Sequence, residues 1–386
     1  MRLVIVGSGV VGAACAFTAA RLGAEVVLVD ADLPGQATAA GAGIICPWSS
    51  HTEDPVWYAF ACQAAREYPA LVAELADVAD GAGVSYRQVG ALMVTDDAEE
   101  AERESQRLRA VQSAAPEMGE VHAVDAAEAS ELFPPLRPGS AGIYVSGAAR
   151  VDGRRLRSAL VRAALAKGAV VTSGRAELAV RAGRLTGVEV DGEVLGADAV
   201  VAAAGAWTAS LVALAGVTVR VAPQRGQIVH LRMDSADTSR WPVVLPAGSG
   251  HYLLAFDDSR IVAGATRETG SGFDARVTAG GMDEVLTQAL AVAPGLAGAS
   301  HLETRVGLRP AGPDIRPLLG PVAVGGDAGT GAGDGAADVR GTCGLVIATG
   351  LGASGLTLGP LTGAIAANVA LGVDQPVDLT PFDPLR

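Results

Sequence analysis

The stretch LVIVGSGVVGAACAFTAARLGAEVVLVD, residues 3–30, decides the fold. It begins with a short apolar run and continues into GSGVVG at positions 7–12, after which small residues lead to Arg21. A second apolar run follows Gly23 and ends in Asp30. Two short apolar runs on either side of a helical stretch predict a strand–helix–strand unit.

The three glycines of this stretch have separate physical roles. Gly7 allows a tight turn after the first strand, Gly9 leaves room for a pyrophosphate against the backbone, and Gly12 lets helix and strand pack closely. The start of the helix presents backbone N–H groups to an anion. Asp30 lies eighteen residues after Gly12, where a carboxylate can accept hydrogen bonds from a ribose. The unit therefore predicts a dinucleotide site, without choosing between NAD and FAD.

The same stretch allows a competing interpretation. Eighteen uncharged residues separate Arg2 from Arg21, enough to suggest a membrane span or a secretory signal. Three glycines interrupt this run, and the second strand arrives at the distance that a strand–helix–strand unit needs. We therefore favour the dinucleotide site.

Composition limits the class of protein. The chain has 386 residues, 49% of them hydrophobic, so it can bury a large core and is expected to hold two domains. Its net charge of −13 argues against nucleic acid and anionic membranes as partners. Lys167, the only lysine, lies at a predicted helix end, which argues against lysine Schiff-base chemistry. The cysteines and histidines lack ligand spacing, so we expect no metal site, no disulfide framework and a cytoplasmic location.

The remainder of the chain predicts two kinds of structure. Residues 55–79 and 97–115 are typical of helices, Asp152 of a helix N-cap, and residues 198–205 of a buried strand that ends at a glycine. Residues 218–266 alternate like antiparallel strands, with a bend at 223–226. Residues 325–341 are rich in Gly, Ala and Asp and predict a surface loop.

These patterns predict an α/β protein with a Rossmann-like nucleotide-binding domain and a discontinuous antiparallel-β (α+β) domain. We place residues 1–80, 140–215 and 310–386 in the nucleotide-binding domain. Residues 81–139 and 216–309 form the second domain, which we expect to bind substrate.

Several segments together carry a family resemblance. In order along the chain they are GSGVVG with Asp30, ATAAGAGII at 37–45, VVAAAGAWT at 200–208, QRGQIVHL at 224–231, YLLAFDDSRIVAGAT at 252–266, GLRPAGPDIRPLLG at 307–320 and ATGLGASGLTLGP at 348–360. In these segments the chain resembles the FAD-dependent D-amino-acid oxidase/dehydrogenase superfamily, which includes glycine oxidase and sarcosine oxidase. The resemblance spans most of the chain and is weakest over residues 80–140.

The resemblance implies a non-covalently bound FAD. Its ADP half would lie on the fingerprint and Asp30, its pyrophosphate and isoalloxazine on residues 38–44, and its flavin edge on the turn at 350–357. The implied cofactor residues are Gly7, Gly9, Val10, Val11, Gly12, Asp30, Ala31, Thr38, Ala39, Ala40, Gly41, Gly43, Ile44, Val171, Ala204, Gly205, Trp207, Arg309, Gly350, Gly352, Ala353, Ser354, Gly355, Leu356 and Thr357.

Three residues are candidates for substrate binding or catalysis. Arg309, in Gly-Leu-Arg-Pro, matches the family arginine that binds the substrate carboxylate, a task suited to a planar guanidinium. Tyr252 matches a hydroxyl position near that carboxylate, although ordinary sheet packing explains it almost as well. His51 follows the predicted flavin loop, where it would line the site or act on the substrate amine. The alternative interpretation is a histidine on a surface loop. His251 alternates to the face opposite Tyr252, so at most one of that pair can face the flavin.

The resemblance implies oxidation of an amino acid, either a D-amino acid or a glycine-like one. The substrate Cα delivers hydride to flavin N5, and the imine product hydrolyses to an oxo acid. Alternatives are a secondary-amine oxidase of the sarcosine or proline type, a 2-hydroxy-acid dehydrogenase, an NAD-dependent dehydrogenase and a non-catalytic flavin-binding module. The expected partner is a small amino acid or amine, with oxygen or another electron acceptor. We expect no nucleic acid partner and no integral membrane segment.

Overall fold

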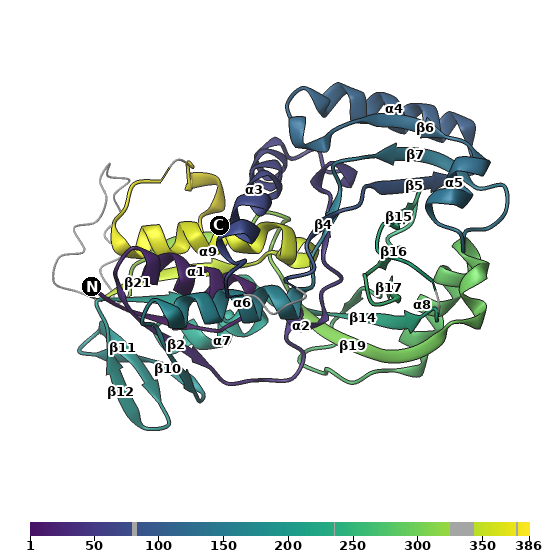
Figure 1. Ribbon diagram of the computed structural model, residues 1–386. Helices are drawn as coiled ribbons and strands as arrows, with labels where there is room; N and C mark the ends of the chain where they lie inside the picture. Colours follow the sequence, from purple (N-terminus) through teal and green to yellow (C-terminus); the bar gives the residue numbers. More distant parts are fainter. Residues whose placement is uncertain (79–82, 235, 325–342, 376) are drawn as a thin grey trace. The chain divides into compact units, whose positions relative to one another are not determined.

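The structure is a computed structural model that describes residues 1–78, 83–234, 236–324, 343–375 and 377–386 (Figure 1). The chain forms two compact units. Unit 1 comprises residues 1–37, 157–223 and 309–386, and unit 2 comprises residues 38–156 and 224–308. Both units are assembled from separate stretches of sequence.

Unit 1 is built on a six-stranded sheet in the order β20-β21-β13-β1-β2-β9, parallel except for β20. Its inner strands are continuous apolar runs, because both faces of a parallel sheet are buried. The strands are β1 (Arg2–Val6), β2 (Glu25–Asp30), β9 (Val170–Ser173), β13 (Ala199–Ala202), β20 (Leu318–Val322) and β21 (Gly344–Thr349).

The two faces of this sheet are covered differently. On one face, helices α1 (Val10–Arg21) and α9 (Gly355–Leu371) lie side by side (Figure 1). A Cβ on Gly359 would overlap the Val10 side chain, and one on Gly363 would overlap the Val11 carbonyl, so these two glycines permit the close approach. The opposite face packs with a three-stranded sheet and α7. Its elements are β10 (Ala176–Arg181), β11 (Arg184–Val190), β12 (Glu193–Gly196) and α7 (Thr208–Ala213).

Unit 2 is built on a nine-stranded sheet in the order β18-β14-β17-β16-β15-β5-β7-β6, with β19 also paired to β14. One face forms an apolar core with helices α5 (Ala126–Leu132) and α8 (Ala279–Val292). The strands are β5 (Ala91–Thr95), β6 (Val121–Val124), β7 (Ala141–Val145), β14 (Ala222–Arg232), β15 (Val243–Pro246), β16 (Tyr252–Ala255), β17 (Arg260–Gly264), β18 (Glu268–Thr269) and β19 (Ser300–Ala311).

Shorter elements complete the fold. Unit 2 contains a small sheet in the order β3-β8-β4. The remaining strands and helices are β3 (Ile44–Ile45), β4 (Arg87–Gln88), β8 (Ala149–Arg150), α2 (Ala37–Ala40), α3 (Pro55–Glu74), α4 (Ala98–Gln112) and α6 (Gly153–Ala166). The 3₁₀ turns are η1 (Pro47–Ser49), η2 (Pro116–Met118), η3 (Gly205–Trp207), η4 (Pro294–Gly298), η5 (Gly352–Ser354) and η6 (Thr380–Phe382).

The predicted α/β fold class is confirmed, and several details differ. The bend expected at 223–226 is wrong, because β14 runs without interruption from Ala222 to Arg232. The sheet of unit 2 is not purely antiparallel, since β15 and β5 pair in parallel. Asp152 caps α6 as predicted, accepting the N–H groups of Arg154 and Arg155 at 3.0 and 3.2 Å. The surface loop predicted over residues 325–341 lies outside the described residues.

The membrane alternative for residues 2–21 is not supported, because that stretch contains strand β1 and a helix of only 12 residues. In the described part of the chain, one helical segment, Gly352–Leu371, has the length and hydropathy of a membrane span. Within it, 67% of the apolar window is buried inside the protein, as in a core helix packed against α1.

Candidate functional site

The glycine fingerprint lies at the carboxyl end of β1. Gly7 has a φ of +101°, which favours glycine, and a Cβ there would overlap the Ala203 carbonyl at the end of β13. A Cβ on Gly12 would overlap the carbonyl of Gly7. Both glycines are therefore needed for the tight strand-to-helix turn. The role of Gly9 against a pyrophosphate stays a prediction.

The start of helix α1 fits an anionic ligand. Its N-cap, Gly9, has no side chain to accept hydrogen bonds from the first turn, and the first turn carries no acid. An uncapped N-terminus leaves the positive end of the helix dipole available to an anion such as a pyrophosphate. The predicted cofactor residues Val10 and Val11 form this first turn.

Asp30 and Arg157 hold the fingerprint loop from two sides. The Asp30 carboxylate accepts the N–H of Ser8 at 2.5 Å and that of Asp32 at 2.7 Å. From helix α6, Arg157 donates Nε to the Ser8 carbonyl at 2.7 Å and Nη2 to the Ser8 hydroxyl. Sequence reasoning missed Arg157, because an arginine on a helix face about 150 residues away gives no local signal.

We predict that Arg157→Met weakens FAD binding. The variant removes two charged hydrogen bonds to the loop, and we expect the Kd for FAD to rise about tenfold, or about 1.4 kcal/mol. Titration of the apoprotein with FAD, followed by flavin fluorescence, measures this change. Arg184→Met on strand β11 is the control and should bind FAD like the wild type. An unchanged Kd for Arg157→Met would show that Arg157 does not support the loop.

The ends of neighbouring strands meet beside the fingerprint. Thr349, which ends β21, donates its hydroxyl to the carbonyl of Gly205 at 2.8 Å. This bond links the predicted segment with Ala204, Gly205 and Trp207 to the C-terminal turn, since η3 contains Gly205 and Trp207. Gly350, with a φ of +76°, begins that turn. The structure thus brings these predicted residues together at the carboxyl ends of the parallel strands, where α/β folds bind ligands.

The C-terminal turn leads directly into helix α9. Gly352, Ala353 and Ser354 form η5, and Gly355, Leu356 and Thr357 begin the helix. No side chain caps this helix N-terminus, and its first turn contains no acid. Helix α9 is therefore a second helix, besides α1, with an uncapped N-terminus at the carboxyl ends of the strands. The positive ends of the two helices suit a cofactor with negative charge at both ends.

Arg309 is brought close to the same turn. The strand β19 ends at Ala311, which forms an antiparallel bridge with Leu351. An added Cβ on Gly312 would lie 3.5 Å from the carbonyl of Gly350. Arg309 therefore precedes, by two residues, the point where β19 joins the predicted flavin turn. At the opposite end of the sheet, Val171 lies on edge strand β9 and pairs with Leu28.

The predicted flavin loop, residues 38–44, belongs to unit 2. Gly43 accepts the N–H of Val151 at 2.9 Å, and a Cβ on Gly43 would overlap the Val151 carbonyl. The Ala39 carbonyl accepts Nε of Arg154 at 3.1 Å and Nη1 of Arg305 at 3.3 Å. Two guanidinium groups thus fix the backbone of this uncharged loop, and neither arginine was singled out from the sequence.

The two remaining candidate residues also lie in unit 2. Tyr252 begins β16, and its ring lies over Gly264, where a Cβ would overlap the phenol. His251 lies 3.6 Å from Glu284 of helix α8, so it points to the helix-covered face, opposite Tyr252. His51 is 63% exposed and lies 3.3 Å from Glu104 of α4. Its predicted catalytic role stays a prediction.

His230 is a buried histidine that the sequence did not single out. Its Nδ1 accepts a hydrogen bond from Arg260 at 3.3 Å, while Arg260 also bonds Asp152 at 2.8 Å. Burial, together with the charges of Arg305 and Arg260, lowers the pKa of His230 to about 3. The imidazole is therefore neutral at physiological pH.

Metal and thiol chemistry have no visible site in the described residues. No group of three or more His, Cys, Asp or Glu side chains there could hold a metal ion. All four cysteines are free, and burial raises the pKa of Cys343 to about 11. That thiol therefore has little thiolate character.

The sheet order, the glycine turn and the two uncapped helices define a dinucleotide-binding protein of the Rossmann class. Residues 2–369 match the DAO family of FAD-dependent oxidoreductases, and the chain belongs to this family. It is therefore a flavin-dependent amine or amino acid oxidoreductase with FAD as its cofactor.

Three relatives show how similar the chain is to other members. It is 44% identical over 383 residues to the uncharacterized oxidoreductase YurR of Bacillus subtilis, covering 99% of this chain and 98% of the relative. It is 30% identical to glycine oxidase of Pseudomonas putida, covering 99% and 98%. The crystal structure of iminodiacetate oxidase from Chelativorans sp. BNC1 is similar with a TM-score of 0.91 and 44% identity, covering 99% of each chain.

Proposed function

We propose that this protein oxidises glycine or an N-substituted glycine at the carbon that carries the carboxylate. The main support is the bridge between Ala311 and Leu351, which brings the strand of Arg309 to the C-terminal turn. Relatives named glycine oxidase and iminodiacetate oxidase act on compounds of this kind.

In the proposed reaction, Arg309 binds the substrate carboxylate through its planar guanidinium. A bidentate contact fixes both the position and the orientation of a carboxylate, so the adjacent C–H bond is held in one direction. FAD, when bound, supplies the two-electron acceptor for the hydride. No side-chain base is required if the amine binds in its neutral form.

The positive end of helix α9 supports the same reaction electrostatically. Its N-terminus carries no capping side chain and no acid, so its backbone N–H groups favour nearby negative charge. An oriented helix dipole would stabilise negative charge on a bound FAD without reorganising. We propose that residues 350–357 have this role.

An anaerobic screen tests the proposed substrate class. The purified holoprotein is mixed without oxygen with glycine, N-methylglycine, iminodiacetate, D- and L-alanine, D- and L-proline and glycolate. We expect flavin absorbance to bleach with the glycine-type amines and not with glycolate. Bleaching with glycolate alone would replace the proposal by 2-hydroxy-acid oxidation. Admitting air afterwards and measuring peroxide tests oxygen as the electron acceptor.

Tyr252→Phe provides a prediction for the substrate-binding role of the tyrosine. The change removes one hydroxyl, and we expect KM for the best substrate to rise about fivefold, corresponding to about 1 kcal/mol. Steady-state kinetics measure the effect. Tyr144→Phe is a matched control, because the hydroxyl of Tyr144 donates to the Val89 carbonyl at 3.1 Å within the same sheet. Equal KM values for Tyr252→Phe and wild type would show that the Tyr252 hydroxyl does not bind substrate and that the residue only packs within the sheet.

A further inference from the structure

The turn between β19 and β20, residues 312–317, joins two segments that contact the predicted flavin turn. Where β19 ends, Ala311 forms an antiparallel bridge with Leu351. Where β20 begins, Leu318 lies against the start of the flavin turn, since a Cβ on Gly350 would be only 2.9 Å from its side chain. The flavin turn is therefore contacted on both sides of Gly350 by segments that this one turn connects, all within unit 1.

Arg386 holds this turn through its side chain. Its Nε and Nη2 donate to the two carboxylate oxygens of Asp314, at 3.1 and 2.8 Å. Nη2 also donates to the carbonyl of Arg316 at 2.8 Å, and Nη1 donates to the carbonyl of Pro317 at 3.1 Å. A further bond of 2.9 Å joins Nη1 to the carbonyl of Asp383. These five bonds give each N–H of the guanidinium an acceptor.

The pair of Arg386 and Asp314 is partly shielded from water. The Arg386 side chain is 19% exposed, against 43% for Asp314. Hydrogen bonds from Arg386 hold the pKa of Asp314 below its ordinary value. Asp314 also accepts the N–H of Arg316 at 2.8 Å, so one carboxylate joins the guanidinium to the backbone of the turn. A bidentate pair of this kind constrains direction as well as distance.

The segment that carries Arg386 is itself packed against unit 1. Phe382, in η6, is buried, and Pro384 lies 3.3 Å from the position that a Cβ on Gly320 of β20 would occupy. Arg220 donates to the carbonyl of Arg386 at 3.0 Å. The guanidinium is therefore held beside β20, where it binds the turn that precedes this strand.

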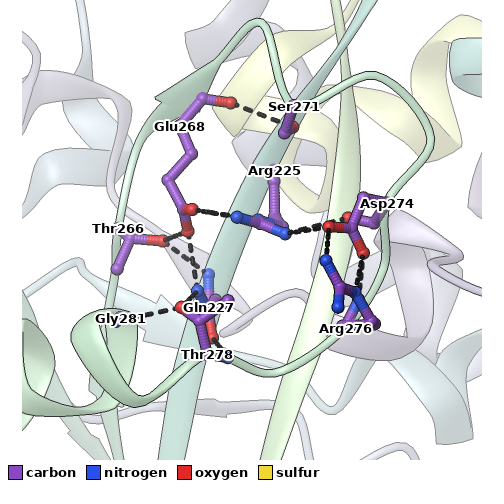
Figure 2. Close-up of polar contacts among 9 residues, drawn as sticks. All are labelled: Arg225, Gln227, Thr266, Glu268, Ser271, Asp274, Arg276, Thr278 and Gly281. Atoms are coloured by element: carbon purple, nitrogen blue, oxygen red, sulfur yellow. Dashed lines mark hydrogen bonds and ion pairs between the residues drawn. The ribbon is translucent and has the colours of Figure 1, made fainter.

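Arg276 of unit 2 forms the same kind of pair without the burial. Its Nε and Nη2 donate to the two carboxylate oxygens of Asp274, both at 3.0 Å (Figure 2). The Arg276 side chain is 83% exposed. An exposed pair contributes little stability, because water screens the charges and the side chains lose entropy. Arg276 is thus a control for the loss of an arginine–aspartate pair as such.

We propose that Arg386 is a positioning residue for the arginine that binds the substrate carboxylate. By holding the turn through Asp314, it sets the spacing between the end of β19 and the predicted flavin turn. Arg309 precedes the bridge at Ala311 by two residues, so a shift of the turn moves Arg309 as well. The inference rests on the proposed function, which assigns the carboxylate to Arg309. Arg386 acts through the turn and not by contact with the substrate.

Binding of propionate to the holoprotein tests this role. Propionate has the shape of glycine with a methyl group in place of the amine, so it can occupy a carboxylate site without amine oxidation. The change in flavin absorbance reports its Kd. For Arg386→Met we expect this Kd to rise about tenfold. Arg386→Lys should restore part of the affinity, because an ammonium keeps the charge without the fork. Arg276→Met should bind propionate like the wild type.

Asp314→Asn shows whether the two residues act through one contact. The single variant should raise the Kd for propionate about three- to tenfold, and Asp314→Asn combined with Arg386→Met should bind no more weakly than Arg386→Met alone. Arg220→Met leaves the side-chain bonds of Arg386 in place and should bind propionate normally. Multiplied effects in the double variant would mean that the two residues act separately, which would overturn the inference.

The remaining outcomes separate this inference from the proposed function. A lower unfolding temperature of Arg386→Met with an unchanged Kd for propionate would overturn the positioning role, because Arg386 would then only stabilise the fold. If Arg309→Met loses propionate binding while Arg386→Met binds normally, the proposed function stands and the positioning role fails. If Arg309→Met binds propionate like the wild type, Arg309 is not the carboxylate site and both fail together.

Discussion

Replacing Arg309 by methionine should lower kcat/KM for every carboxylate-bearing amine by roughly 100- to 1,000-fold. The variant removes a bidentate charged contact, which is worth about 3–4 kcal/mol when it orients the reacting group. Anaerobic stopped-flow reduction of the bound flavin measures the loss directly. Arg309→Lys should remain far below wild type, since an ammonium lacks the planar fork.

The controls for Arg309 separate binding from stability. Arg309→Met should retain most of its flavin absorbance and its unfolding temperature, because the other predicted cofactor residues remain and the main role proposed for Arg309 is to bind substrate. Arg220→Met, which removes a hydrogen bond of 3.0 Å to the carbonyl of Arg386 in the same unit, should keep wild-type kinetics. Wild-type efficiency in Arg309→Met on all carboxylate substrates would refute the proposed role.

Replacing Gly12 by valine should abolish FAD binding at micromolar concentrations. The first carbon of the new side chain would overlap the carbonyl of Gly7, so helix α1 would have to move away from the strand turn. Overpacking of this kind costs about 1–3 kcal/mol or more, and it displaces the N–H groups proposed to hold the pyrophosphate. The flavin content of the purified protein and its denaturant unfolding curve measure the two effects.

Gly280→Ala is the matched control for a glycine in a helix. Nothing lies within 4 Å of its added Cβ, and Gly280 lies in the first turn of α8. Since alanine favours helix more than glycine, we expect about 0.5–1 kcal/mol of added stability and normal flavin content. A flavin-loaded, stable Gly12→Val protein would show that the fingerprint tolerates a side chain there.

Local sequence patterns predicted the fingerprint of unit 1 and one helix cap in unit 2 well. The fingerprint, both flanking strands and the Asp152 cap depend on residues within a few turns of one another, so their pattern is visible in a single sequence. The bend predicted at 223–226 was wrong, because Pro223 is the second residue of β14 and precedes the first pair of β14 with β18, Gln224 with Thr269. A proline at the start of a strand need not donate to the ladder, so it did not interrupt β14.

Contacts between distant segments could not be predicted from residue patterns. Nothing near Gly359 or Gly363 reveals that each lies against α1, almost 350 residues earlier. Arg157 looks like an ordinary surface arginine in the sequence, because charge alone does not identify a partner. Only the folded chain shows that Arg157 contacts Ser8.

The order of strands in unit 1 has a consequence for synthesis of the protein. Strand β1 leaves the ribosome before β13 and β21, yet it lies next to β13, and β13 pairs with β21 at Gly344–Thr349. Helix α1 similarly meets α9 through Gly359 and Gly363. One flank of the sheet beside β1 and one face of α1 therefore stay uncovered until β21 and α9 have emerged. Contacts of such long sequence separation form slowly, and during that interval the nascent chain is exposed to aggregation and to chaperones.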